Sequence, residues 1–420
     1  MNRRKIVLKE IKEFTFMEQQ LEKSTFHPRS TGQTILLIAG ILLIAFNLRP
    51  AITSVGPVIG AIRSDLQLSN GLAGFLTTLP LLSFALLSPI APKIGKRLGN
   101  ERTLWLGLAV LLFGIVIRSF GSITFLMMGT ALVGVGIAIC NVLLPGLVKH
   151  KFPAHAGLMT SVYTTSMSVF AALASGVSVP LSHAMPGGWN TSFLVWAGLA
   201  LLAMMVWAPQ LLHQNTAAVK SISLKEQPIW RSRVAWQVTF FMGLQSFLFY
   251  CSIAWFPDIL TSHGMNLATA GWMLSIMQFT GLPSTFLTPV FAEKLKTQRP
   301  LVVGLVLVYL LGMMGLLLGG STPILVISVL FIGVGQGASI SLALTFIGLR
   351  TTNMEQAAAL SGMAQSLGYL LAAVGPFMIG ILFDVTHTWT PAIIIFIIVL
   401  FFMFISGMRA GRSVYISDPS

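Results

Sequence analysis

Charged residues are scarce in this sequence. They make up 9% of its 420 residues, whereas 55% of the residues are hydrophobic. Soluble domains carry about 25% charged residues, so this composition excludes a soluble globular protein. It predicts a polytopic membrane protein that is embedded in a lipid bilayer.

Cysteines and acidic residues are also few. The two cysteines, Cys140 and Cys251, both fall in apolar runs, which argues against a disulfide framework and a cysteine metal site. The 12 Asp and Glu residues are scattered singly, whereas a membrane enzyme would need clustered carboxylates to hold Mg²⁺. We therefore expect no catalytic residues, no metal and no cofactor. The sequence also shows no signalling domain, which disfavours a sensor that does not transport.

Long apolar runs, by contrast, recur throughout the sequence. Twelve of them are long enough to cross a bilayer as a helix, which takes about 20 residues. They predict an all-α polytopic membrane protein with twelve transmembrane helices in two sets of six. The predicted parts are an N-terminal extension, a six-helix bundle, a linker, a second six-helix bundle and a tail, at residues 1–33, 34–209, 210–232, 233–409 and 410–420.

Basic residues gather in alternate loops. Cytoplasmic loops of membrane proteins carry an excess of Lys and Arg, so the pattern predicts a multi-pass plasma-membrane protein with both termini in the cytoplasm. Only Arg63 and Arg118 fall on the predicted outer side, together with Asp65, Asp258 and Asp384. Because the net charge of +14 is distributed by topology, we expect no nucleic-acid partner.

The two sets of six runs resemble each other at a shift of about 200 residues. Pro57 matches Pro257, and the segment 88–90 (Ser-Pro-Ile) matches 288–290 (Thr-Pro-Val). A Gly-Val-Gly segment at 134–136 recurs at 333–335. Two such halves joined by a polar linker resemble the major facilitator fold, whose binding site lies between the halves near the midplane. The resemblance also implies a monomer, the usual oligomeric state in this superfamily.

The loop between the second and third runs resembles the major facilitator signature GxxxDRxGRR. Gly95 and Gly99 fit the signature, whereas Lys96 stands where it carries Asp. We interpret the charged residues of this loop as gating residues, with a glutamate in place of the missing Asp: Arg97, Glu101 and Arg102. The alternative is a basic loop that is fixed by membrane topology alone.

The segment 47–57, NLRPAITSVGP, gives the most specific resemblance. It is similar to the cyanate porter family of the major facilitator superfamily, which includes cyanate permeases and 2-nitroimidazole transporters. The resemblance extends over about residues 35–409. It implies a secondary active transporter that moves a small anionic or nitro-type solute by alternating access.

Arg49 lies near the centre of the first run, where burial of its charge costs about 2.5–3.5 kcal/mol on insertion scales. No Asp or Glu lies in the apolar part of any run. We therefore predict that Arg49 is the central substrate-binding residue, since a guanidinium pairs well with an anion or a strong dipole. Alternatively, Arg49 donates to carbonyls that are freed where Pro50 interrupts the helix.

Other polar side chains near mid-span complete the predicted substrate site. They are Asn47, Asn141, Tyr163, Gln245, Tyr250, Gln278, Gln336, Gln365 and Tyr369. Each amide has a rival role as an interhelical hydrogen-bonding group, worth about 0.6–2 kcal/mol.

The function has one main alternative, a multidrug-type exporter of neutral small molecules. Such exporters tend to place an acidic residue in the cavity, whereas this chain places a basic one there. No titratable carboxylate lies inside the predicted bundle, so the sequence does not fix what drives transport. A co-transported proton, an exchanged anion and facilitated flux all stay open.

Overall fold

The computed structural model describes residues 31–152, 155–212, 229–352 and 354–416. Most of the predicted N-terminal extension and linker, and the last four residues of the tail, lie outside these ranges. Residues 1–39 and 40–420 form two separate units. The packing described below is that of the second unit.

The regular elements of the described ranges are helices. The first half holds α2 (Thr31–Asn47), α3 (Pro50–Thr53), α4 (Val55–Leu66), α5 (Asn70–Leu87), α6 (Ala91–Leu98), α7 (Asn100–Arg118), α8 (Ile123–Lys151), α9 (Ala156–Ala184), α10 (Trp189–Trp207) and η2 (Ala208–Leu212). The second half holds η3 (Ile229–Arg231), α11 (Arg233–Ser262), α12 (Leu267–Lys294), α13 (Arg299–Leu318), α14 (Thr322–Leu349), α15 (Met354–Thr386) and α16 (Thr390–Ala410).

Eleven helices within the described residues are long and apolar enough to cross a membrane. The remaining predicted span, the eighth along the chain, corresponds to α12, which has 28 residues but is not among the eleven. This helix carries two prolines, Gln278 and several hydroxyl residues, so its composition is less apolar than that of its neighbours. The all-α membrane fold is confirmed.

Polar caps fix where several spans begin. The Ser69 hydroxyl accepts from the Leu72 N–H at 3.2 Å at the start of α5. The side chain of Asn266 accepts from the Thr269 N–H at 2.8 Å at the start of α12. Such caps satisfy backbone donors that have no partner inside the helix, so a short loop between two apolar runs is enough to start the next span.

The first span is not one continuous helix. It breaks between α2 and α3, where Pro50 lacks a backbone N–H, and again between α3 and α4. The second break is covered by Arg118, a fully buried residue whose guanidinium donates to the Ala51 carbonyl at 2.6 Å. The same guanidinium lies 4.2 Å from the ring centroid of Phe193.

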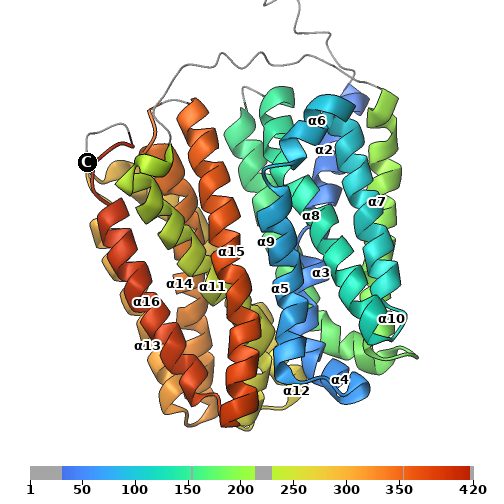
Figure 1. The fold of residues 1–420 in the computed structure, drawn as a ribbon, viewed down its shortest axis with the longest axis vertical. Helices are drawn as coiled ribbons and strands as arrows, with labels where there is room; N and C mark the ends of the chain where they lie inside the picture. Colours follow the sequence, from blue (N-terminus) through green and yellow to red (C-terminus); the bar gives the residue numbers. More distant parts are fainter. Residues whose placement is uncertain (1–30, 153–154, 213–228, 353, 417–420) are drawn as a thin grey trace, which may run out of the picture. The chain divides into compact units, whose positions relative to one another are not determined.

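Helices from the two halves pack against each other along two seams. In one seam α5 runs along α15, and in the other α9 runs along α12. Figure 1 shows α5, in blue, beside α15, in red-orange. We call the end of the bundle that carries Asp65, Asp258 and Asp384 the acidic end, and the opposite end, with α6 and Lys151, the basic end.

The halves are held together closely at the acidic end. Asp384, near the end of α15, accepts from the Asn70 N–H at 3.0 Å, the Asn70 side chain at 2.6 Å and the Gly71 N–H at 2.8 Å. A Cβ atom at Gly56 would overlap the carbonyl oxygen of Ile253, and one at Gly74 would overlap that of Pro376. Backbone therefore touches backbone between the halves at this end.

Candidate functional site

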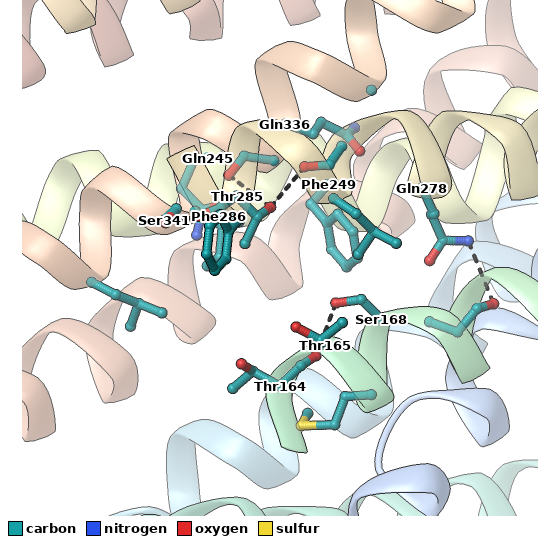
Figure 2. Close-up of a pocket in the computed structure, with 18 of the residues that line it drawn as sticks. Thr164, Thr165, Ser168, Gln245, Phe249, Gln278, Thr285, Phe286, Gln336 and Ser341 are labelled. Atoms are coloured by element: carbon teal, nitrogen blue, oxygen red, sulfur yellow. Dashed lines mark hydrogen bonds between the residues drawn. The ribbon is translucent and has the colours of Figure 1, made fainter. Parts of the chain in front are cut away.

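A cavity of about 760 Å³ lies between the two halves. Its wall is formed by Arg49 and by side chains of α9 in the first half and of α11, α12, α14 and α15 in the second. Figure 2 shows the hydroxyls of Thr164, Thr165 and Ser168 facing Gln245, Phe249 and Thr285 across this space.

Arg49 is the charged residue of this cavity. It stands at the break between α2 and α3, and its guanidinium carbon lies 5.0 Å from the ring centroid of Phe249 in α11. Among the described residues that line the cavity, no other is charged. No hydrogen bond or ion pair joins its guanidinium to another described residue, so its positive charge is available to a ligand.

A chain of aromatic rings from both halves begins at Phe249, beside Arg49. Ring centroids lie 5.2 Å apart for Phe249 and Tyr250, 6.4 Å for Tyr250 and Tyr369, and 5.3 Å for Tyr369 and Phe84. Both phenols line the cavity together with Arg49. Within the described part of the chain, neither phenol forms a hydrogen bond. The hydroxyl groups of these two tyrosines are therefore available as hydrogen-bond donors near the guanidinium.

The three cavity glutamines differ from Arg49, because neighbouring side chains already hold their amides. Gln245 donates to the Ser246 hydroxyl at 2.7 Å. Gln336 donates to Ser252 at 2.9 Å and to Tyr309 at 3.1 Å, and Gln278 donates across the halves to Ser175 at 2.8 Å. The amide N–H groups of Gln336 and Gln278 therefore join different helices, whereas that of Gln245 is held within α11.

Six of the ten predicted binding residues line the cavity, namely Arg49, Gln245, Tyr250, Gln278, Gln336 and Tyr369. The other four do not line it. Asn47 donates to the carbonyls of Leu43 at 2.8 Å and Leu199 at 3.3 Å. Gln365 donates to the Ser361 hydroxyl at 2.9 Å, Tyr163 is buried and Asn141 is half-buried. The rival role of interhelical hydrogen bonding fits Asn47, whose amide joins the first span to α10.

A row of hydroxyl side chains on the cavity wall was not predicted from the sequence. Thr160, Thr164 and Ser168 follow one another at intervals of four in α9, and Ser341 and Thr345 do so in α14. Side chains four apart lie on the same helix face. This spacing is the signal that would have identified the wall, although single Ser and Thr residues are common in membrane helices.

The cavity runs from mid-span toward the basic end. Thr160 lies close to the start of α9, and Val290 and Thr345 lie close to the ends of α12 and α14. The acidic end is closed by the Asp384 contacts and by the glycine contacts described above. The described structure therefore presents Arg49 toward the basic end.

The predicted gating residues lie at the basic end. Glu101 is buried and pairs with Lys151 Nζ at 2.6 Å, which joins α7 to α8 within the first half. Arg97 and Arg102 are exposed. Their gating role stays a prediction.

The sequence matches a known protein family. Residues 37–373 match the profile of the Major Facilitator Superfamily. The chain belongs to this superfamily. It is 63% identical to the uncharacterized transporter YycB of Bacillus subtilis, over 93% of this chain and 97% of the relative. It is 43% identical to the 2-nitroimidazole transporter of Escherichia coli, over 90% and 96% of the two chains, and 24% identical to the cyanate transport protein CynX of the same organism, over 83% and 90%.

Solved structures agree with this major facilitator fold. The D-xylose-proton symporter superposes with a TM-score of 0.73 at 16% identity, covering 91% of this chain and 97% of the symporter. The nucleoside transporter NupG superposes with a TM-score of 0.74 at 11% identity, covering 90% and 100%. The resemblance to the cyanate and nitroimidazole branch of the superfamily is confirmed, and the protein is a membrane transporter of the major facilitator type.

Proposed function

We propose that this transporter moves a small anionic or nitro-type polar solute across the plasma membrane by alternating access. Arg49 is its central substrate-binding residue. The observation that carries the proposal is the position of Arg49, which is the one charged side chain among the described residues of the cavity wall and has no protein partner there. An anion or a nitro group would supply that partner.

The relatives support this substrate class. One whose printed name is 2-nitroimidazole transporter is 43% identical, and one whose printed name is cyanate transport protein is more distant. A nitro group offers two coplanar oxygens to the paired donors of a guanidinium, and cyanate offers a negatively charged terminal atom that can accept from it. A multidrug-type exporter of neutral molecules would not need a positive charge in its cavity.

Alternating access explains why one end is closed. The acidic end, which we assign to the outside, holds the halves together, whereas the cavity extends to the basic end, which we assign to the cytoplasm. Both termini then lie in the cytoplasm. The second state of the cycle would separate the halves at the acidic end, exposing Arg49 to the other side of the membrane.

The test is a binding panel on the purified full-length protein and its Arg49→Ala variant. Cyanate, nitrite, nitrate, small carboxylates and 2-nitroimidazole are added while the melting temperature is measured. A ligand at about 100 times its dissociation constant adds roughly 2.7 kcal/mol of stability. We expect at least one of these ligands to stabilise the native protein and none to stabilise Arg49→Ala, whose membrane insertion stays intact.

Arg49→Lys separates fork recognition from simple charge. A lysine keeps the charge but loses the planar pair of donors, so we expect weak binding in this variant. Equal ligand shifts in the native protein and in Arg49→Ala would refute the substrate role of Arg49. A variant that no longer accumulates as folded protein would instead favour its structural role at the Pro50 break.

A further inference from the structure

The polar groups of the cavity are divided into donors and acceptors. Four wall hydroxyls donate to main-chain carbonyls, so their hydrogens are already used. They are Ser168, Thr285, Ser341 and Thr345. A hydroxyl that donates its hydrogen keeps lone pairs that can accept. This part of the wall, on the way to the basic end, is therefore rich in acceptors.

The available donors gather at the other end of the cavity. The cavity glutamines have their N–H groups bound to neighbours, as described above. Arg49, Tyr250 and Tyr369 form no hydrogen bond with other described residues, all three line the cavity, and the ring centroids of the two tyrosines lie 6.4 Å apart. Tyr250 and Tyr369 come from α11 and α15, whereas Arg49 comes from the first half. One negatively charged group could therefore accept hydrogen bonds from both halves at once.

We propose that Arg49, Tyr250 and Tyr369 bind the single oxyanion group of a planar organic molecule, whose other end donates a hydrogen bond to the hydroxyl wall. The inference rests on the proposed function and narrows its substrate class. A flat ring suits the space beside Phe249 and Phe286, which also line the cavity. A second anionic group would meet the lone pairs of these hydroxyls, so we expect a dianion to bind more weakly than a monoanion.

Size also favours an organic molecule over an inorganic anion. Ligand sites enclose most of the ligand surface, and cavities of about 300–1,000 Å³ suit molecules of drug size. The cavity of about 760 Å³ lies in this range. Nitrite or cyanate would occupy the three donors and leave the apolar wall and the hydroxyl wall without contacts.

The experiment compares matched ligands by calorimetry on the purified full-length protein. 4-Hydroxybenzoate has an oxyanion and a distal donor, 4-methoxybenzoate has the oxyanion and only a distal acceptor, and terephthalate is a dianion. We expect 4-hydroxybenzoate to bind about two- to tenfold more tightly than 4-methoxybenzoate, the range of one neutral hydrogen bond. Nitrite, cyanate and terephthalate should bind more weakly than either.

Tyrosine variants test the donors directly. Tyr250→Phe and Tyr369→Phe keep the rings and their edge-to-face contacts but remove the hydroxyls. Each should weaken 4-hydroxybenzoate binding about tenfold or more, as expected for a hydrogen bond to a charged group. Tyr415→Phe is the control, because Tyr415 is exposed and does not line the cavity. Unchanged melting temperatures without ligand would show that both cavity variants are folded.

The outcomes separate this inference from the proposed function. If Arg49→Ala abolishes binding but both tyrosine variants bind normally, the role of Arg49 stands and the three-donor site is wrong. If nitrite binds as tightly as 4-hydroxybenzoate, the organic substrate class is wrong. If the two benzoates bind equally, the acceptor wall does not contribute. If no member of the panel binds the native protein, the proposed site fails as a whole.

Discussion

Two arginines of the first half are placed among apolar helices but have different surroundings. The guanidinium of Arg118 is fully buried, donates to Ala51 and stacks on Phe193. The guanidinium of Arg49 has Phe249 on one side and the cavity on the other. Arg118 therefore stabilises a helix break, whereas Arg49 is available to a ligand.

Removal of Arg118 should destabilise the protein without altering the ligand site. Arg118→Ala leaves the Ala51 carbonyl without its donor, and an unsatisfied buried acceptor costs about 1–3 kcal/mol. We expect a lower melting temperature in detergent and an unchanged dissociation constant for any ligand that Arg49 binds. Arg412→Ala is the control, since Arg412 is exposed and surface changes usually stay within about 0.5 kcal/mol.

An Arg118→Ala variant as stable as the native protein would show that the free-energy cost of burying the guanidinium equals the stabilisation that its contacts provide. Arg118→Met would then help to interpret the result, because it fills the space without a charge. A methionine variant more stable than the native protein would identify Arg118 as a functional residue retained at an energetic cost.

At the residue scale, the sequence predicts how deep a polar side chain lies in the membrane better than it predicts its hydrogen-bond partners. Arg49 and the mid-span amides were located from their positions in apolar runs alone. The partners of Gln336, however, are Ser252 and Tyr309, which lie 84 and 27 residues away in the sequence. Whether an amide faces a ligand or a neighbouring helix depends on such distant contacts, which a single sequence does not contain.

The contact between α15 and α5 is the most specific connection at the scale of elements. A carboxylate at a helix N-terminus interacts favourably with the helix dipole, and Asp384 also accepts from Asn70 and Gly71. Charge-assisted hydrogen bonds are stronger than neutral ones. This contact favours the state in which the acidic end is closed.

Asp384→Ala should therefore shift the protein toward a state that is open at the acidic end. Spin labels at Gln67→Cys and Val385→Cys, which are exposed on different halves, would report the separation by pulsed electron resonance. We expect a population at longer distance in the variant. The native cysteines, Cys140 and Cys251, are buried, which limits background labelling.

Asp65→Asn provides the matched control for this measurement. Asp65 also lies at the acidic end, but it accepts from Trp189 within the first half, at 3.0 Å. An identical distance distribution in native protein and Asp384→Ala would show that the α15–α5 contact does not hold the end closed.

Glycine contacts between the halves lead to a second prediction for this end. Gly56→Ala would place a methyl group against the Ile253 carbonyl, in backbone that cannot move aside cheaply. We expect the closed acidic end to be lost and transport to fall strongly. Gly198→Ala in α10 meets nothing within 4 Å and should be neutral in a transport assay. Normal transport by Gly56→Ala would mean that the halves never approach as closely as described.

Among the elements, the helices themselves were predictable and their irregularities were less so. Apolar runs separated by polar turns located the spans, and Pro50 indicated the first break. The break at Ser54 has no comparable signal, because it depends on Arg118 covering the Ala51 carbonyl from a helix more than sixty residues away. The sequence also did not single out α12 as less apolar than the other spans, because its apolar run is long enough to cross a bilayer.

At the scale of the whole molecule, the internal repeat was enough to predict the major facilitator fold. The conformational state was not predictable, because alternative states of one sequence differ by only a few kcal/mol. Contacts such as Gly56 against Ile253 belong to one of these states. The division at residues 209 and 233 stays a prediction, as does the placement of the termini.

Topology and state can be tested together. Thr165→Cys lies on the exposed part of the cavity wall, and Gln67→Cys lies at the acidic end. A membrane-impermeant thiol reagent should modify Thr165→Cys only from the cytoplasmic face and Gln67→Cys only from the outside. Modification on the reversed faces would invert the assigned orientation of both termini.

The single charge of the described cavity wall also determines how a membrane voltage would act on the cycle. An empty site carries the positive charge of Arg49, whereas a site that holds a monovalent anion is neutral. Moving one charge through the full field is worth about 2.3 kcal/mol per 100 mV, so voltage acts on the return of the empty carrier and leaves the loaded step unaffected. Flux would therefore respond to voltage only when that return limits the rate.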